Sequence, residues 1–152
     1  MKMNSLKTDL AKAEAGIWIG DIPDFPGVEL KVRPQGNPDY RVLYQRLIQT
    51  VPRGKKRAGA ITDPEMKAQV DGRCLADTIL VDWKGFEDDD NKPLAYSPEL
   101  AKQLLSEVDM QALRDAVVWA AGVAEEEARV SLEDDAKNSK PRSSGSSTGQ
   151  TS

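Results

Sequence analysis

The residues of this chain that could take part in chemistry are mainly carboxylates, and the densest group is the acidic run 87–90. A calcium-binding loop starting at Asp88 would place Glu99 at its twelfth position. However, Lys92 stands where a ligand is needed, and Pro93 stands where the turn needs glycine. The run is therefore interpreted as a solvated turn that could also dock a basic partner. Its candidate contact residues are Asp88, Asp89 and Asp90.

The sequence lacks the combinations on which most enzyme active sites depend. There is no histidine, so the commonest general base and metal ligand is missing. The single cysteine, Cys74, cannot form an internal disulfide and is interpreted as a small buried hydrophobic residue. No G-x-S-x-G, Walker-type loop or Cys/His cluster is present. The sequence predicts a protein that is not an enzyme, with no catalytic residues, no cofactor and no metal site.

A second charged group lies in a glycine-containing segment and is basic. Its members are Arg53, Lys55, Lys56 and Arg57. No aromatic residues are interleaved with them, so stacking on single-stranded nucleic acid is not indicated. The net charge of −4 also argues against a nucleic-acid partner. The segment is interpreted as a solvated loop or as a docking site for an acidic partner.

Length and composition predict one domain with tails. The chain has 152 residues, of which 39% are hydrophobic and 30% are charged, which indicates a small core with much solvated surface. No apolar run approaches the roughly 20 residues of a membrane span. Residues 1–6 lack the apolar core of a secretory signal, so the expected location is the cytoplasm, with no membrane partner.

The first third of the chain predicts an arm followed by a β-hairpin. Residues 1–15 have the composition of a helical or flexible arm. Residues 17–19 are apolar, and residues 28–33 alternate apolar and charged side chains with the period of a strand. Turn residues separate the two segments, so residues 16–33 form the predicted hairpin. Because a two-stranded hairpin is marginal alone, it should pack against helices.

Helices are predicted over the rest of the chain from caps and apolar stripes. Asn37-Pro38 and Ser97-Pro98 are typical helix starts. The pair Asp71-Gly72 lies inside the second helix, where it predicts a kink or a break. The predicted helices are about 38–49, 62–83, 98–106 and 109–128.

These elements predict an α+β fold that is mainly α, with an N-terminal β-hairpin packed on a small helical bundle. The predicted domain spans residues 16–130. Residues 131–152 are polar and are predicted to form a disordered tail.

Aromatic residues are the candidate contacts to a protein partner. Trp83 and Trp119 are interpreted as core anchors, with insertion into a pocket of a partner as the alternative. Trp18 lies on the hairpin, which carries less core. The candidate partner-binding residues are Trp18, Trp83, Phe86, Tyr96 and Trp119.

Several segments follow one another in a fixed order between residues 16 and 124. They are Gly16-Ile17-Trp18-Ile19, residues 28–33, Gly36-Asn37-Pro38-Asp39-Tyr40, Asp82-Trp83-Lys84-Gly85-Phe86 with the acidic turn 87–94, Tyr96-Ser97-Pro98-Glu99, and residues 113–124. This succession resembles the tail assembly chaperones of long-tailed bacteriophages. One departure is Asn91-Lys92, where relatives often have glycine.

The resemblance implies a binding function. Such chaperones coat the tape-measure protein, keep it soluble and help recruit tail-tube subunits, so these two proteins are the expected partners. The expected location becomes the host cell cytoplasm, and the chain is expected to be absent from the mature virion. One alternative is a small structural virion protein, such as a tail component or a head-completion protein. Another is a nucleic-acid-binding regulator. The chain could also associate with itself.

Overall fold

The structure, a computed structural model, describes residues 1–138. The predicted disordered tail began at residue 131, but the last helix, α5 (Gln111–Asn138), continues through the first part of that tail. Extending an existing helix avoids the cost of nucleation, so even this polar stretch can be helical. The rest of the predicted tail, residues 139–152, lies outside the described residues.

The predicted fold class is confirmed: helices dominate, and a small antiparallel sheet packs against them. The sheet contains β1 (Ile17–Ile19), β2 (Glu29–Val32) and β5 (Leu80–Lys84), in the order β1-β2-β5. The two strands of the predicted hairpin pair as expected, with Ile17 opposite Val32. The apolar side chains of the second strand, Leu30 and Val32, are fully buried.

The predicted helix over residues 62–83 is wrong at its C-terminal end. The helix α3 (Pro64–Thr78) stops at Thr78, and β5 follows and pairs with β2, with Trp83 opposite Leu30. Val81 is β-branched and Trp83 is aromatic, and both types suit a strand, while the free edge of β2 offers partners for the backbone groups of β5. The hairpin is thereby completed into a three-stranded sheet. No break occurs at Asp71-Gly72, where α3 is continuous.

The predicted helix starts are confirmed by side-chain caps. The Asn37 side chain accepts a hydrogen bond from the Tyr40 amide at 3.0 Å, and the Ser97 hydroxyl accepts one from the Leu100 amide at 3.1 Å. These caps begin α2 (Pro38–Ile48) and α4 (Pro98–Leu105). The remaining elements are η1 (Met3–Leu6), α1 (Leu10–Ala15), η2 (Arg53–Lys55), β3 (Lys56–Arg57), β4 (Ala60–Ile61) and η3 (Val108–Met110).

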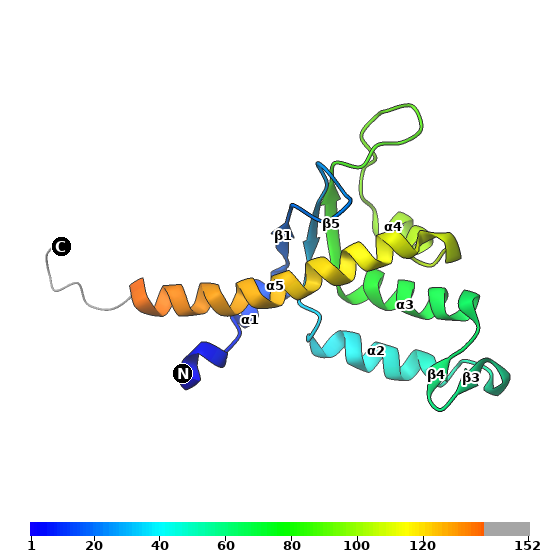
Figure 1. Cartoon of the computed structure of the whole chain (residues 1–152), viewed down its shortest axis with the longest axis horizontal. Helices are drawn as coiled ribbons and strands as arrows, with labels where there is room; N and C mark the ends of the chain where they lie inside the picture. Colours follow the sequence, from blue (N-terminus) through cyan, green and yellow to red (C-terminus); the bar gives the residue numbers. More distant parts are fainter. Residues whose placement is uncertain (139–152) are drawn as a thin grey trace, which may run out of the picture.

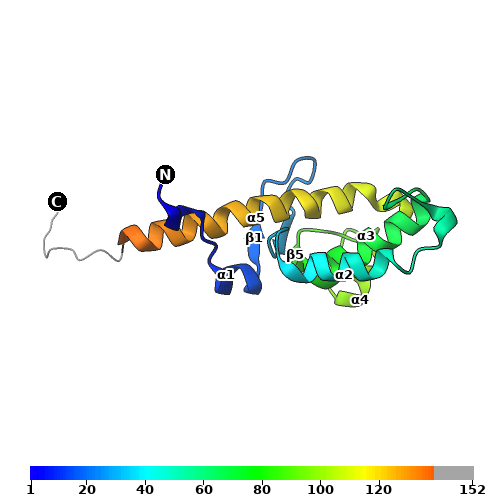
Figure 2. The same ribbon diagram turned by 90° about the horizontal axis from the view of Figure 1, so that it is seen from below.

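The helix α3 is the centre of the helical part. The helices α2 and α4 both pack against it, and α5 crosses the molecule, contacting α3 and the strands β1 and β2 (Figures 1 and 2). Two hydrophobic clusters result. The larger, called the main core, joins the sheet to α3, α4 and α5. The smaller, called the α2 cluster, consists of Leu43, Leu47, Val51, Ile61, Val70 and Cys74.

Candidate functional site

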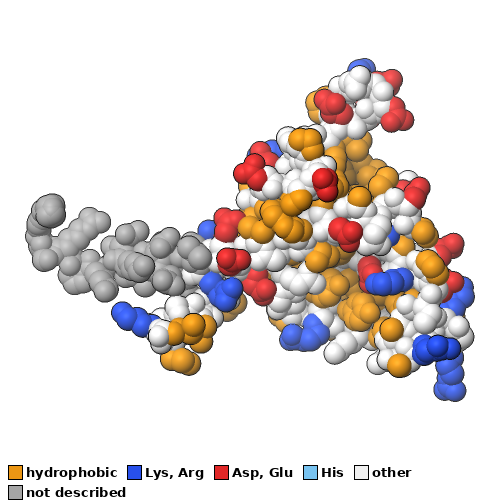
Figure 3. All heavy atoms as spheres, viewed as in Figure 1, with side chains coloured by type: hydrophobic (Ala, Val, Ile, Leu, Met, Phe, Trp, Pro, Cys, Tyr) orange, Lys and Arg blue, Asp and Glu red, His pale blue; other side chains and the backbone are white. Residues whose placement is uncertain are grey.

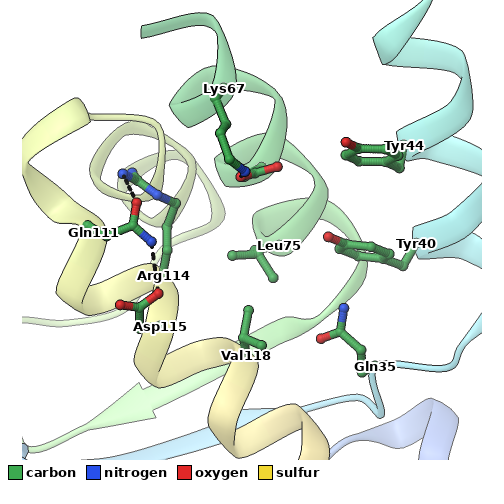
Figure 4. A pocket seen from close by; sticks show the side chains of 10 residues that line it. Gln35, Tyr40, Tyr44, Lys67, Leu75, Gln111, Arg114, Asp115 and Val118 are labelled. Atoms are coloured by element: carbon green, nitrogen blue, oxygen red, sulfur yellow. Dashed lines mark hydrogen bonds and ion pairs between the residues drawn. The ribbon is translucent and has the colours of Figure 1, made fainter. Parts of the chain in front are cut away.

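A groove of about 410 Å³ lies between α2, α3 and α5 (Figure 4). Its apolar surface comes from Tyr40 and Tyr44 on α2, Leu75 on α3 and Val118 on α5. The two tyrosine rings stack with centroids 6.3 Å apart and an interplanar angle of 10°. Figure 3 shows hydrophobic side chains gathered on this face between α5 and α2. The groove therefore offers a tyrosine wall and an aliphatic surface to a partner.

The polar side chains around the groove are paired with one another. The Lys67 amine lies 2.6 Å from the Asp71 carboxylate, and the Gln111 amide donates to the Asp115 carboxylate at 2.8 Å. The Arg114 side chain is buried, and its guanidinium donates to the backbone carbonyls that close α4 and form η3. Arg114 therefore stabilises the junction of α4 and α5, and the groove presents little unpaired charge.

The base of the groove holds an unusual polar group. The side-chain oxygen of Gln35 is buried and has no hydrogen-bond partner among the described residues. Figure 4 shows this side chain near the Tyr40 ring. Burial of Tyr40, together with the nearby Asp71 carboxylate, raises the pKa of its phenol. A tyrosine with its ordinary pKa is already neutral at physiological pH, so the Tyr40 hydroxyl can serve there as a hydrogen-bonding group of the groove.

The thiol of Cys74 lies in the α2 cluster and is fully buried. Burial, reinforced by Asp71, raises its pKa from 9.0 to about 11. A thiol with a raised pKa carries little thiolate at neutral pH and is a poor nucleophile. The interpretation of Cys74 as a small buried hydrophobic residue agrees with this environment.

Three of the predicted partner-binding aromatics meet within the protein itself. The Trp83 ring lies 5.4 Å from Phe86 and 5.1 Å from Tyr96, both edge to face. Its indole N–H donates to the Leu94 carbonyl at 2.8 Å. Only 4% of Trp83 is exposed, so the partner-binding prediction is wrong for this residue. Phe86 and Tyr96 are partly buried against the same core, and the cluster anchors both ends of the acidic turn.

The other two predicted aromatics lie apart from this cluster. Trp18 is partly buried on β1, where the Lys84 amine lies 4.0 Å from its ring centroid. Trp119 lies on α5 and is 40% exposed, so its interpretation as a core anchor is wrong. It follows Val118 and lies one turn after Asp115, which places it beside the groove-lining row of α5.

The acidic turn is exposed and organised by its own backbone. The Asp88 carboxylate accepts hydrogen bonds from the amides of Asp90 and Lys92 at 2.8 and 3.0 Å. Asn91 has a φ of +60°, a left-handed conformation that asparagine tolerates better than most residues other than glycine. Within residues 1–138, no group of three or more His, Cys, Asp or Glu side chains could hold a metal ion.

The basic segment forms a small hairpin of β3 and β4, and half of its charges have structural partners. The Lys56 amine donates to the Ile48 carbonyl at 3.0 Å, and the Lys55 amine lies 3.8 Å from the Asp63 carboxylate. Arg53 and Arg57 are exposed. In Figure 3 this basic end and the acidic turn lie at separate extremities, so the structure does not bring the two predicted docking groups together.

The groove itself was missed from the sequence. Tyr40 and Tyr44 lie four residues apart on one face of α2, and this spacing is the sequence signal that could have drawn attention to them. Nothing in the sequence indicates that α5 returns opposite them. No helix in the described part of the chain is long and apolar enough to cross a membrane.

Comparison with known proteins places the chain in a family. A family model described as YdaY prophage protein matches residues 35–138, more than half of the chain. The matched region includes α2, α3 and α5, and therefore every element that lines the groove. No curated protein and no solved structure matches the chain. The protein is of phage origin and belongs to the YdaY prophage protein family.

Proposed function

We propose that this prophage protein is a tail assembly chaperone that binds a helix of the tape-measure protein in the groove between α2, α3 and α5. The observation that supports the proposal most directly is the groove, with its tyrosine wall and aliphatic surface. Amphipathic helices commonly bind by laying an apolar face into such a groove. The resemblance to tail assembly chaperones implies the tape-measure protein as the partner, and the phage origin supports this choice.

The groove suits protein binding better than chemistry. Tyrosine is enriched at protein interfaces because its ring combines a large contact area with a hydrogen-bonding hydroxyl. Trp119, an exposed residue next to the groove-lining Val118, adds apolar surface on α5 beside the groove. The groove residues with charges are already paired, so a partner helix would meet mainly apolar and neutral polar groups. Such a surface could shield the apolar stripe of a long helical partner.

The proposal places the protein in the host cell cytoplasm during tail assembly and outside the mature virion. The competing function is a small structural virion component, which would remain in purified particles. The third reading, a nucleic-acid-binding regulator, is weakened because Lys55 and Lys56 already have partners within the protein.

The test is co-expression of the full chain with the tape-measure protein encoded in the same prophage, followed by pull-down and measurement of tape-measure solubility. The informative variant is Val118→Glu, which places a charge in the groove. The matched control is Val42→Glu, because Val42 is an exposed valine of α2 that does not line the groove. The wild-type chain and the control should bind and solubilise the tape-measure protein, and Val118→Glu should lose about tenfold or more in affinity.

Two results would contradict the proposal. The first is a tape-measure protein whose solubility and recovery do not change with the wild-type chain. The second is equal binding by Val118→Glu and Val42→Glu, which would remove the groove from the interaction. Mass spectrometry of purified particles separates the competing function, because a structural component would be recovered at a fixed copy number and a chaperone would not.

A further inference from the structure

The N-terminal arm, residues 1–15, presents apolar side chains to solvent. Met3, Leu6 and Leu10 are 77%, 49% and 76% exposed, and Met1 is fully exposed. Ala13 is the one buried residue of the arm. Clustered apolar exposure of this kind marks contact sites for other macromolecules. The arm lies outside the region matched by the family model, and it is separate from the groove.

The arm lies beside the outer half of α5, here defined as residues 122–138. Both η1 and α1 contact α5, and α5 projects beyond the sheet and the other helices (Figures 1 and 2). At about 1.5 Å per residue, this 28-residue helix is about 42 Å long. Ala124 and Ala128 are fully buried, whereas Glu126 and Glu127 are exposed. The described side chains of this half, in residues 122–129, therefore offer an acidic surface next to an apolar arm.

The charges of these two segments are complementary. The arm contains three lysines and two carboxylates, and residues 122–129, the part of the outer half of α5 whose side chains the structure describes, contain three carboxylates and one arginine. No arm lysine forms an ion pair with any of these three carboxylates. The arm lysines are Lys2, Lys7 and Lys12. Within residues 1–129, each chain thus carries a basic apolar surface and an acidic surface that are not paired with each other.

We propose that the protein forms a two-fold symmetric dimer in which the arm of each copy packs on the outer half of α5 of the other copy. A two-fold contact is isologous, so one interface covers both apolar arms and matches both sets of opposite charges. The adjacency of arm and helix within one chain places both halves of this interface at the same end of the molecule. A second copy is therefore the occupant whose chemistry fits both surfaces at once.

The test is the molar mass of the full chain in solution, measured by light scattering during size-exclusion chromatography across a range of protein concentrations. The wild-type chain should reach the dimer mass, because association of this kind depends on concentration. The variant Met3→Glu with Leu10→Glu should raise the dissociation constant of the dimer about tenfold or more, because it removes apolar contact and places negative charge against the acidic helix. The control is Val42→Glu, at an exposed valine outside the arm and α5, which should dimerise like the wild-type chain. Circular dichroism should show that all three chains remain folded.

A charge exchange sharpens the test. Glu126→Lys with Glu127→Lys should weaken dimerisation, because lysines of the helix then face lysines of the arm. Adding Lys2→Glu with Lys7→Glu should restore dimerisation, because the two surfaces again carry opposite charges. A monomeric wild-type chain at every concentration would overturn the proposal. Unchanged dimerisation of the arm variant would overturn it as well, because the dimer would then use another surface.

Discussion

The main core and the α2 cluster differ in how many elements hold them. The main core is enclosed by all three strands of the sheet together with α3, α4 and α5, and Leu30, Ile79 and Leu105 are almost completely buried within it. The α2 cluster has α2 on one side and α3 on the other, closed at one end by the chain around Val51 and Ile61. A cluster with fewer covering elements opens at a lower free energy. We therefore expect α2 to be less firmly held than α5.

This difference bears directly on the groove, because its two walls belong to different clusters. Val118 projects from α5, which is fixed by the main core, and Tyr44 projects from α2, which packs on the α2 cluster. Tyr40 contacts both clusters. One wall should thus be rigid and the other adjustable, an arrangement that would let the groove accommodate helices of different side-chain size.

The strongest way to break the main core is Trp83→Ala. The substitution removes the indole ring that packs against Phe86 and Tyr96 and leaves the Leu94 carbonyl without its donor. Large-to-small changes of this type cost about 3–5 kcal/mol, so we expect a loss of about 4 kcal/mol in the free energy of unfolding, measured by urea denaturation. The acidic turn should also become more sensitive to proteolysis.

The variant Trp83→Phe serves as the control for Trp83→Ala. This variant keeps an aromatic ring but loses the hydrogen bond to the Leu94 carbonyl, so the free energy of unfolding should fall by about 1–2 kcal/mol. A loss below about 2 kcal/mol for Trp83→Ala would show that the ring cluster does not anchor the main core.

The α2 cluster should weaken as pH rises, through Cys74. Its thiol loses a proton near pH 9 when unfolded and near pH 11 when folded. Between these values the unfolded chain binds fewer protons, so the free energy of unfolding falls as pH rises. A displacement of two pKa units corresponds to a loss on the order of 2–3 kcal/mol. The measurement is urea unfolding at several pH values across this window.

The variant Cys74→Ala should lose less stability over the same pH window. Burial also raises the pKa of Tyr40 and Tyr96, so part of the decline should remain in the variant above pH 10. An identical pH profile for both chains would show that the Cys74 thiol does not titrate differently in the folded state.

A matched pair of leucine truncations compares the two clusters. Leu47→Ala in the α2 cluster should cost about 2 kcal/mol, at the low end for leucine, because Leu47 lies at the edge of its cluster. Hydrogen exchange should show lost protection mainly in the amides of α2. Leu105→Ala in the main core should instead lower protection throughout the sheet and α3. Equal loss of protection across the molecule in both variants would mean that the two clusters unfold as one unit.

Local signals in the sequence predicted much of the fold. The alternation of residues 28–33 identified the buried face of β2, and the caps at Asn37 and Ser97 placed the starts of α2 and α4. These features depend on side chains within a few residues of one another. For the same reason, the fold class could be predicted without knowing how the elements pack.

Features that depend on distant contacts could not be predicted in this way. The strand β5 is apolar enough to continue the helix before it, and only pairing with β2 decides its conformation. The burial of Trp83 and the exposure of Trp119 follow from which elements cover them. The groove requires α5 to return opposite α2, a relation between residues more than seventy positions apart in the sequence.

The smallest predicted effect concerns Gly72, where α3 and α4 approach each other most closely. A Cβ atom at this position would lie 2.6 Å from the amide nitrogen of Ser106 and closer still to the Leu105 carbonyl. Backbone atoms cannot move aside easily, so Gly72→Ala must displace α4, at a cost of about 1–3 kcal/mol. The higher helix propensity of alanine offsets about 1 kcal/mol of this cost, so the free energy of unfolding should fall by about 1 kcal/mol in all.

The matched control for Gly72→Ala is Gly122→Ala in α5. A Cβ atom at Gly122 would meet no atom within 4 Å, so this variant should gain about 0.5–1 kcal/mol from helix propensity alone. Thermal unfolding measures the change in stability of each variant. The difference between the two changes gives the contribution of the close contact between α3 and α4. Because α4 packs in the main core, Gly72→Ala should leave hydrogen exchange in α2 almost unchanged. Equal stabilisation by both substitutions would show that α3 and α4 can separate at Gly72 without cost. The main core would then be held no more firmly than the α2 cluster, contrary to the comparison above.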